Sequence, residues 1–90
     1  MKLTAIKNHI ESELEYNASL GKDAYFLFEG ENEEYLFEIS FEIKRDDDGM
    51  NFYEITEFIA WLGEEDKRKS LPNILNYFNN LAADVSNQIL

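Results

Sequence analysis

The chain has no cysteine, and its 90 residues include only one proline, one histidine and four glycines. Without cysteine there is no disulfide, thiolate nucleophile or thiolate zinc site. The histidine, His9, stands beside the apolar stripe of a predicted helix, where an exposed side chain is expected rather than a metal ligand. The glycines stand singly at predicted element boundaries, so no glycine-rich phosphate loop is present. We therefore expect no catalytic residue, no cofactor and no metal.

Long apolar runs are also missing. The longest cover residues 24–28 and 58–62, far short of the roughly 18–20 residues that a membrane-spanning helix needs. The first residues turn polar at once and lack the apolar centre of a signal peptide. Since a chain of this length has room for one core, we expect a single domain over residues 1–90, cytoplasmic and without a membrane partner.

Basic residues are scarce, and the negative charge is concentrated. The net charge is −11, and residues 29–66 alone carry fourteen acids against two bases. Residues 67–90 carry a net charge of +2. A field of this kind repels nucleic acid and acidic membranes and attracts basic partners. We therefore expect no direct binding of nucleic acid.

Two stretches have helical periodicity. The first predicts a helix over residues 4–20, ended by Gly21 as a C-cap. The second predicts a helix that begins after Ser70 as N-cap, with Pro72 in its first turn. The two apolar stripes are Leu3, Ile6, Ile10 and Leu14, and then Leu71, Ile74, Leu75, Phe78, Leu81, Ala82, Val85 and Ile89.

The middle of the chain alternates with period two, which is typical of half-buried strands. Residues 24–29 add a further strand, joined through a polar hairpin loop at residues 30–33. The order is α-β-β-β-α, which predicts an α+β fold: a three-stranded antiparallel meander with two helices packed on one face. A charged connector occupies residues 63–70. The alternating apolar positions are Tyr35, Phe37, Ile39, Phe41 and Ile43, then Tyr53, Ile55, Ile59 and Trp61.

The aspartate run at residues 46–49 has three possible roles. A calcium-binding EF-hand loop would place Lys44 and Ile55 at ligand positions, which neither side chain can fill. Catalytic carboxylates need a concave site, and a hairpin tip offers none. A three-residue hairpin loop with Gly49 in the left-handed conformation fits instead. We expect a turn, with Asp46 opposite Met50.

This turn fixes a strand register. It places Glu42 directly opposite Glu54 on the face away from the helices, with Glu38 one step along the strand. Like charges so placed cost up to about 1 kcal/mol. Two interpretations remain open: a solvated face whose repulsion is screened by salt, or a basic partner that supplies the counter-charge. The other predicted pairs are Ile43–Tyr53, Phe41–Ile55, Phe37–Ile59, Tyr35–Trp61 and Ser40–Thr56.

Two details of this register concern the far end of the sheet. Glu57 falls on the apolar face opposite Ile39, which indicates a bulge or a shifted strand end rather than a functional buried acid. An apolar patch is predicted on the outer face, as a homodimer seam or docking site, unless a helix or the connector covers it. The members of this patch are Leu36, Phe58, Ala60 and Leu62.

Two family resemblances follow. The element order resembles the double-stranded RNA-binding domain, and residues 67–69 (Lys-Arg-Lys) stand where that family keeps basic residues. The net charge of −11 argues against RNA binding. Through the acidity of residues 29–66, the chain also resembles small acidic phage proteins that mimic nucleic acid, including anti-CRISPR and anti-restriction inhibitors. That resemblance implies a non-enzymatic inhibitor.

Two functional hypotheses remain. The first is a DNA mimic that occupies the basic site of a nuclease or another nucleic-acid-binding protein, or an immunity protein or antitoxin acting in the same way. The second is a small dimeric adaptor or secretion-chaperone-like domain whose acidity serves only solubility. The residues expected to bind a basic partner are Glu31, Glu33, Glu34, Glu38, Glu42, Asp46, Asp47, Asp48 and Glu54.

Overall fold

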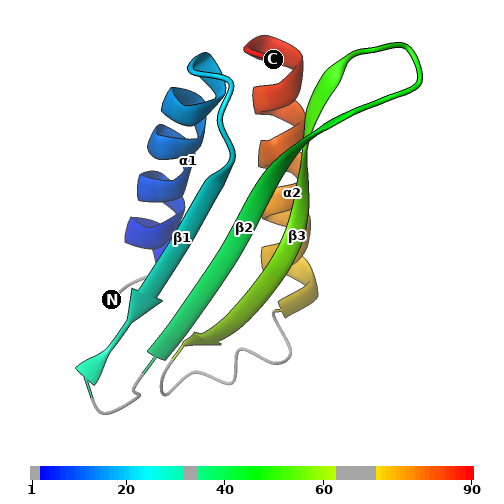
Figure 1. Ribbon diagram of the computed structural model, residues 1–90. Coiled ribbons are helices and arrows are strands. Elements are labelled where there is room, and N and C mark those ends of the chain that lie inside the picture. The colour runs from blue at the N-terminus through cyan, green and yellow to red at the C-terminus, as the bar shows by residue number, and fades with distance from the viewer. Residues whose placement is uncertain (1–2, 32–34, 63–70) are drawn as a thin grey trace.

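The computed structural model describes residues 3–31, 35–62 and 71–90. Its elements are α1 (Leu3–Ser19), β1 (Ala24–Glu29), β2 (Tyr35–Arg45), β3 (Asn51–Leu62) and α2 (Leu71–Gln88). The strands form one antiparallel sheet in the order β1-β2-β3, and both helices lie on the same side of it (Figure 1). The predicted α-β-β-β-α meander is confirmed. Glu33, Glu34, Ser70 and the connector at residues 63–70 lie outside the described residues.

Helix α1 buries the stripe that its periodicity predicts. Ile6, Ile10 and Leu14 are fully buried against the sheet and α2. After Ser19 the backbone turns at Gly21, which has a φ of 66°. The N–H of Gly21 donates to the Ala18 carbonyl at 3.0 Å, and this satisfies a carbonyl that the helix end would leave unpaired. Gly21 is therefore the C-cap that the sequence predicts.

The core between sheet and helices is aromatic. Phe37 and Phe41 on β2 and Phe78 on α2 are its largest fully buried side chains. The Phe78 ring lies 5.5 Å from Phe37 and 6.5 Å from Phe41, centroid to centroid, within the range of favourable aromatic pairs. Because these rings point toward the helices, the alternate side chains of β2 face away from the core.

The β2–β3 hairpin ends in the expected turn. Gly49 has a φ of 80°, a region that costs other residues about 1–2 kcal/mol. The N–H of Asp46 donates to the Met50 carbonyl at 2.9 Å, and the N–H of Gly49 donates to the Asp46 carbonyl at 3.0 Å. The tip of the hairpin projects outward past α2, away from the rest of the sheet (Figure 1). The prediction that Asp46 lies opposite Met50 is confirmed.

The strand register is right near the turn and wrong beyond it. Ile43–Tyr53, Phe41–Ile55 and Glu42–Glu54 pair as predicted. Beyond them, Ser40 pairs with Glu57 instead of Thr56, because Thr56 is one extra residue on β3 and forms a bulge. The predicted pairs Phe37–Ile59 and Tyr35–Trp61 are therefore replaced by Phe37–Ala60 and Tyr35–Leu62. The bulge interpretation of Glu57 is confirmed.

The bulge also overturns the predicted apolar patch. Ala60 is buried in the core, and Phe58 packs edge-on against Phe37 with ring centroids 5.8 Å apart. Leu62 pairs with Tyr35 and so shares the shifted register. Of the three predicted residues whose side chains the structure describes, Leu36 keeps its expected position. One inserted residue turns every following side chain of a strand to the other face, which accounts for the correction.

Candidate binding face

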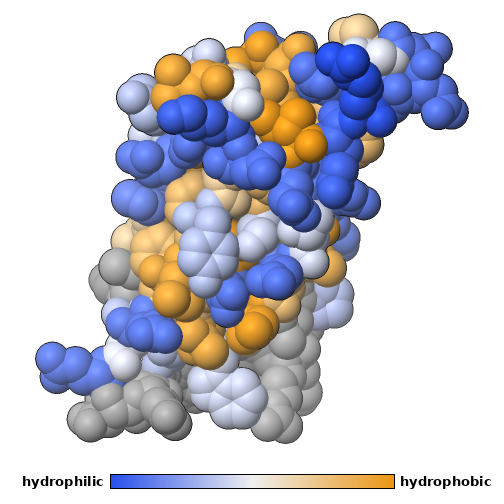
Figure 2. Space-filling view, viewed as in Figure 1, coloured by the Kyte–Doolittle hydropathy of each residue, from blue (hydrophilic) through white to orange (hydrophobic). Residues whose placement is uncertain are grey.

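The sheet has an outer face, defined here as the side turned away from both helices. Figure 2 views this side and shows apolar and hydrophilic residues interleaved over the strands, with hydrophilic residues gathered at the β2–β3 hairpin. The strand pairing and the alternation of side chains assign its members. They are Tyr25, Leu27 and Glu29 from β1, Leu36, Glu38, Ser40, Glu42 and Lys44 from β2, and Phe52, Glu54, Glu57, Ile59 and Trp61 from β3.

Carboxylates gather in the middle of the outer face. Glu42 lies directly opposite Glu54, and Glu57 lies opposite Ser40 in the next row. Asp23, just before β1, lines the same shallow hollow of about 370 Å³ as Glu42 and Glu57. Acids from β2, from β3 and from the residue before β1 therefore converge on one region, although the sequence stretch that holds them spans more than thirty residues.

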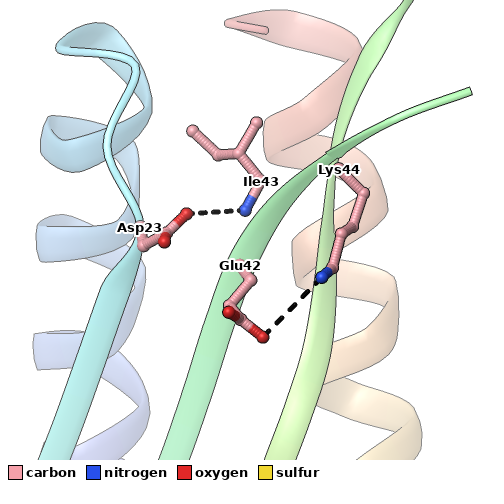
Figure 3. Close-up of polar contacts among 4 residues, drawn as sticks. All are labelled: Asp23, Glu42, Ile43 and Lys44. Carbon is pink, nitrogen blue, oxygen red and sulfur yellow. Dashed lines mark hydrogen bonds and ion pairs between the residues drawn. The ribbon is translucent and has the colours of Figure 1, made fainter.

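Little of this negative charge is compensated by the molecule itself. Among the described residues one ion pair is present, between Lys44 Nζ and Glu42 Oε2 at 3.9 Å (Figure 3). Both of its side chains are 45% exposed, and exposed pairs of this kind contribute about 0.2–1 kcal/mol. Asp23 instead accepts a hydrogen bond from the Ile43 N–H at 2.8 Å (Figure 3). The face therefore keeps a net negative charge.

Glu38 occupies a different environment from the other acids. It lies on the central strand between Leu27 of β1 and Ile59 of β3, which are 45% and 46% exposed. The Tyr25 hydroxyl donates a hydrogen bond to Glu38 Oε1 at 3.0 Å. This hydrogen bond is the main cause that raises the pKa of Tyr25 above its ordinary value. The Glu38 carboxylate is thus oriented by the Tyr25 hydroxyl and has an apolar side chain on each side.

The end of the outer face nearest the β1–β2 loop is apolar. A hollow of about 560 Å³ is lined there by Glu29, Gly30, Tyr35, Leu36, Ile59 and Trp61. A Cβ on Gly30 would lie 2.5 Å from the Tyr35 ring, so any side chain at this position would force that ring to shift. Exposed aromatic and aliphatic side chains beside charged ones are typical of protein-binding surfaces.

The predicted acidic residues do not all come together. Asp46 uses its carboxylate within the turn, where Oδ1 accepts the N–H groups of Asp48 at 3.0 Å and Met50 at 2.8 Å. Asp47 and Asp48 are exposed at that tip, whereas Glu31 is exposed near the opposite end of β2. The described acids therefore form one group in the middle of the sheet, with other acids lying apart from it at the hairpin tip and at the opposite end of β2.

Other kinds of site find no support in the described ranges. No group of three or more acidic, histidine or cysteine side chains in residues 3–31, 35–62 and 71–90 could hold a metal ion. His9 packs edge-on against Phe26 and Phe28, with ring centroids 6.2 and 5.6 Å apart. None of the helices in these ranges is long and apolar enough to cross a membrane. No protein family, curated protein or solved structure matches the chain.

Several residues of the outer face were absent from the sequence prediction. Four of them lie in the two runs, residues 24–28 and 58–62, in which every position is apolar, and two acids lie directly before these runs. Alternation cannot assign a face in such runs, because both parities look alike. The charge of Glu57 was the one available signal for the shift. The missed residues are Asp23, Tyr25, Leu27, Glu57, Ile59 and Trp61.

Proposed function

We propose that the protein is a non-enzymatic inhibitor whose outer face occupies the basic site of a nucleic-acid-handling protein. The observation that supports the proposal is the convergence of Glu42, Glu54 and Glu57 in one region of the outer face. Among the described residues, Lys44 is the one base that forms an ion pair there, and it pairs with Glu42. Opposed carboxylates repel each other by up to about 1 kcal/mol. A cationic partner that lies between them relieves this repulsion and so gains affinity.

The acids form an extended array, as the phosphates of a nucleic acid strand do. Glu38 and Glu42 stand four residues apart on β2, which corresponds to about 13 Å along a strand. Glu54 and Glu57 extend the array sideways onto β3. Lysine and arginine side chains that hold successive phosphates of a nucleic acid strand are candidates to bind such an array.

The partner class follows from this chemistry. Nucleases of bacterial defence, such as CRISPR effectors and restriction enzymes, hold a phosphate backbone in a basic groove, and so do the toxin nucleases that immunity proteins neutralise. The exposed apolar residues beside the acids supply the uncharged part of the interface. We place this activity in the cytoplasm, where such partners meet nucleic acid.

The test is competition with nucleic acid. The immobilised protein is used to capture proteins from a bacterial lysate at low salt, and duplex DNA is then added at constant ionic strength. We expect DNA to displace the captured protein. We also expect the chain to block DNA binding by that purified protein, measured by fluorescence anisotropy.

Matched variants separate the outer face from net charge. Glu42→Gln, Glu54→Gln and Glu57→Gln combined should weaken inhibition about tenfold, since three exposed charge pairs contribute roughly 0.5 kcal/mol each. The control replaces three exposed acids of α1, Glu11, Glu13 and Glu15, by glutamine and changes the net charge equally. The proposal fails if DNA displaces nothing or if both triple variants weaken inhibition to the same extent.

A second candidate function is a dimeric adaptor, which the exposure of Leu27 and Ile59 favours. Its seam would be the apolar end of the outer face instead of the patch that the sequence predicted. Light scattering tests this function. A dimer that persists in high salt and dissociates in an Ile59→Asp variant supports the adaptor, and a monomer at all concentrations excludes it.

A further inference from the structure

We propose that Leu27, Glu38 and Ile59 form a receptor for one arginine side chain of the basic partner. This proposal rests on the function proposed above, because it names the chemical group of the basic partner that binds to this part of the outer face. The three residues come from the three strands and pair directly across the sheet. They therefore form a single row, with the carboxylate in the centre and an apolar side chain on each side.

The dimensions of this row suit an extended aliphatic stem. Neighbouring strands lie about 4.8 Å apart, so Leu27 and Ile59 stand roughly 10 Å from each other across β2. A methylene chain that lies over the Glu38 side chain would contact the apolar side chains on both sides, since apolar contacts form within about 4.0–4.5 Å. The exposure of Leu27 and Ile59, 45% and 46%, leaves apolar area for such a stem to cover.

The carboxylate is oriented before any partner arrives. Tyr25 donates its hydroxyl hydrogen to Glu38 Oε1 at 3.0 Å, which leaves Oε2 and one lone pair of Oε1 for a ligand. Among the described residues, the Glu38 carboxylate forms no ion pair and no further hydrogen bond. Lys44, the base on the same face of β2, pairs with Glu42. Tyr25 acts here as a positioning residue, and its raised pKa agrees with a neutral donor to an anionic acceptor.

Arginine fits this arrangement better than lysine. Its planar guanidinium presents parallel N–H groups that match both oxygens of a carboxylate, and it is more weakly hydrated than an ammonium group. Its aliphatic stem packs on apolar surface while the charged head reaches the acid. A lysine interacts with the same carboxylate as a single point charge, so the fixed orientation of the carboxylate adds less to its affinity.

The experiment uses nona-arginine and nona-lysine as probes, because the two peptides carry equal charge. Each is titrated into the isotope-labelled protein, and amide chemical shifts report the site and the affinity. We expect nona-arginine to bind about fivefold more tightly, which corresponds to about 1 kcal/mol, the net contribution of one ordinary hydrogen bond. Its shifts should centre on Leu27, Glu38 and Ile59.

Two variants test the assignment to one carboxylate. Glu38→Gln should abolish the preference for arginine, whereas Glu42→Gln, with the same change of charge on the same strand, should weaken both peptides and keep the ratio. Tyr25→Phe should reduce the preference by about half, because the carboxylate loses its fixed orientation. The amide spectra of all three variants also show whether each has folded.

Three results would overturn the proposal of an arginine receptor. They are equal affinity for both peptides, an arginine preference that survives Glu38→Gln, and peptide-independent shifts at Leu27 and Ile59 that grow with protein concentration. The last would mean that a second copy of the chain occupies the row. Equal peptide affinities with successful DNA displacement refute only the receptor. An arginine preference without DNA displacement refutes only the nucleic-acid-site proposal.

Discussion

Replacing Ser86 by alanine should destabilise the fold, although the change removes only one oxygen atom. The Ser86 hydroxyl on α2 accepts a hydrogen bond from the Tyr53 N–H at 2.9 Å and donates one to the Ala82 carbonyl at 2.6 Å. Strand β3 is an edge of the described sheet, so alternate backbone groups along it have no strand partner. Ser86 satisfies one of these groups where it is buried.

The size of the effect follows from two opposing terms. In Ser86→Ala the Tyr53 N–H stays buried without an acceptor, which costs about 1–3 kcal/mol. Alanine is the better helix former, which offsets about 0.5 kcal/mol of this loss of stability. The net loss is therefore about 0.5–2.5 kcal/mol, which corresponds to a Tm roughly 2–20 °C lower for a domain of this size.

Urea unfolding followed by circular dichroism measures this difference directly. Ser12→Ala is the matched control, since Ser12 is exposed on α1 and the same change there should be neutral or stabilising by up to about 0.5 kcal/mol. If Ser86→Ala unfolds within 0.5 kcal/mol of the parent chain, roughly the uncertainty of such a comparison, then the Tyr53 N–H has another acceptor or reaches water. The proposed link between α2 and the sheet edge would then be wrong.

Three further predictions concern the turn, the opposed acids and a buried tyrosine. Gly49→Ala should cost about 1–2 kcal/mol in urea unfolding because Gly49 has a φ of 80°; Gly49→Asn should cost less, and equal losses would contradict this cause. Glu54→Lys should stabilise by up to about 1 kcal/mol by removing the repulsion from Glu42, and a gain that high salt leaves unchanged would exclude an electrostatic origin. Burial, with the charge of Asp23 adding to it, raises the pKa of Tyr53 from 10.0 to about 12. Since its folded pKa lies above the unfolded value, Tyr53 contributes stability that is complete below pH 10 and is lost as the pH rises through about 12. Tyrosinate absorbance should show a group that titrates near pH 12 and disappears in Tyr53→Phe.

Local signals were sufficient to predict most of the fold. The left-handed glycines at positions 21 and 49 mark a helix end and a hairpin turn, because few other residues adopt that backbone conformation without strain. The helix stripes and the alternation in β2 fix the buried faces independently of any long-range contact. These features identify α1, α2 and the register of the hairpin next to its turn.

The binding face was harder to predict because it depends on a single residue. Residues 58–62 are all apolar, so the pattern there fits either face of the sheet. The charge of Glu57 indicated an irregularity, but it did not say by how many residues the pairing would shift. The same ambiguity in residues 24–28 concealed Tyr25 and Leu27. Only the pairing of all three strands assigns these side chains.

The bulge at Thr56 links the stability of the core to the charge of the outer face. Without it, Glu57 would lie opposite Ile39 in the core, and burying an unpaired carboxylate costs several kcal/mol. Interrupting the ladder at one position costs less, since a single hydrogen bond contributes about 0.5–1.5 kcal/mol. The irregular register is therefore the cheaper arrangement. It moves Phe58 into the core, sets Glu57 beside Ser40 near the opposed pair, and exposes Ile59 next to Glu38. The acidic group and the apolar flank of Glu38 therefore have a common structural origin.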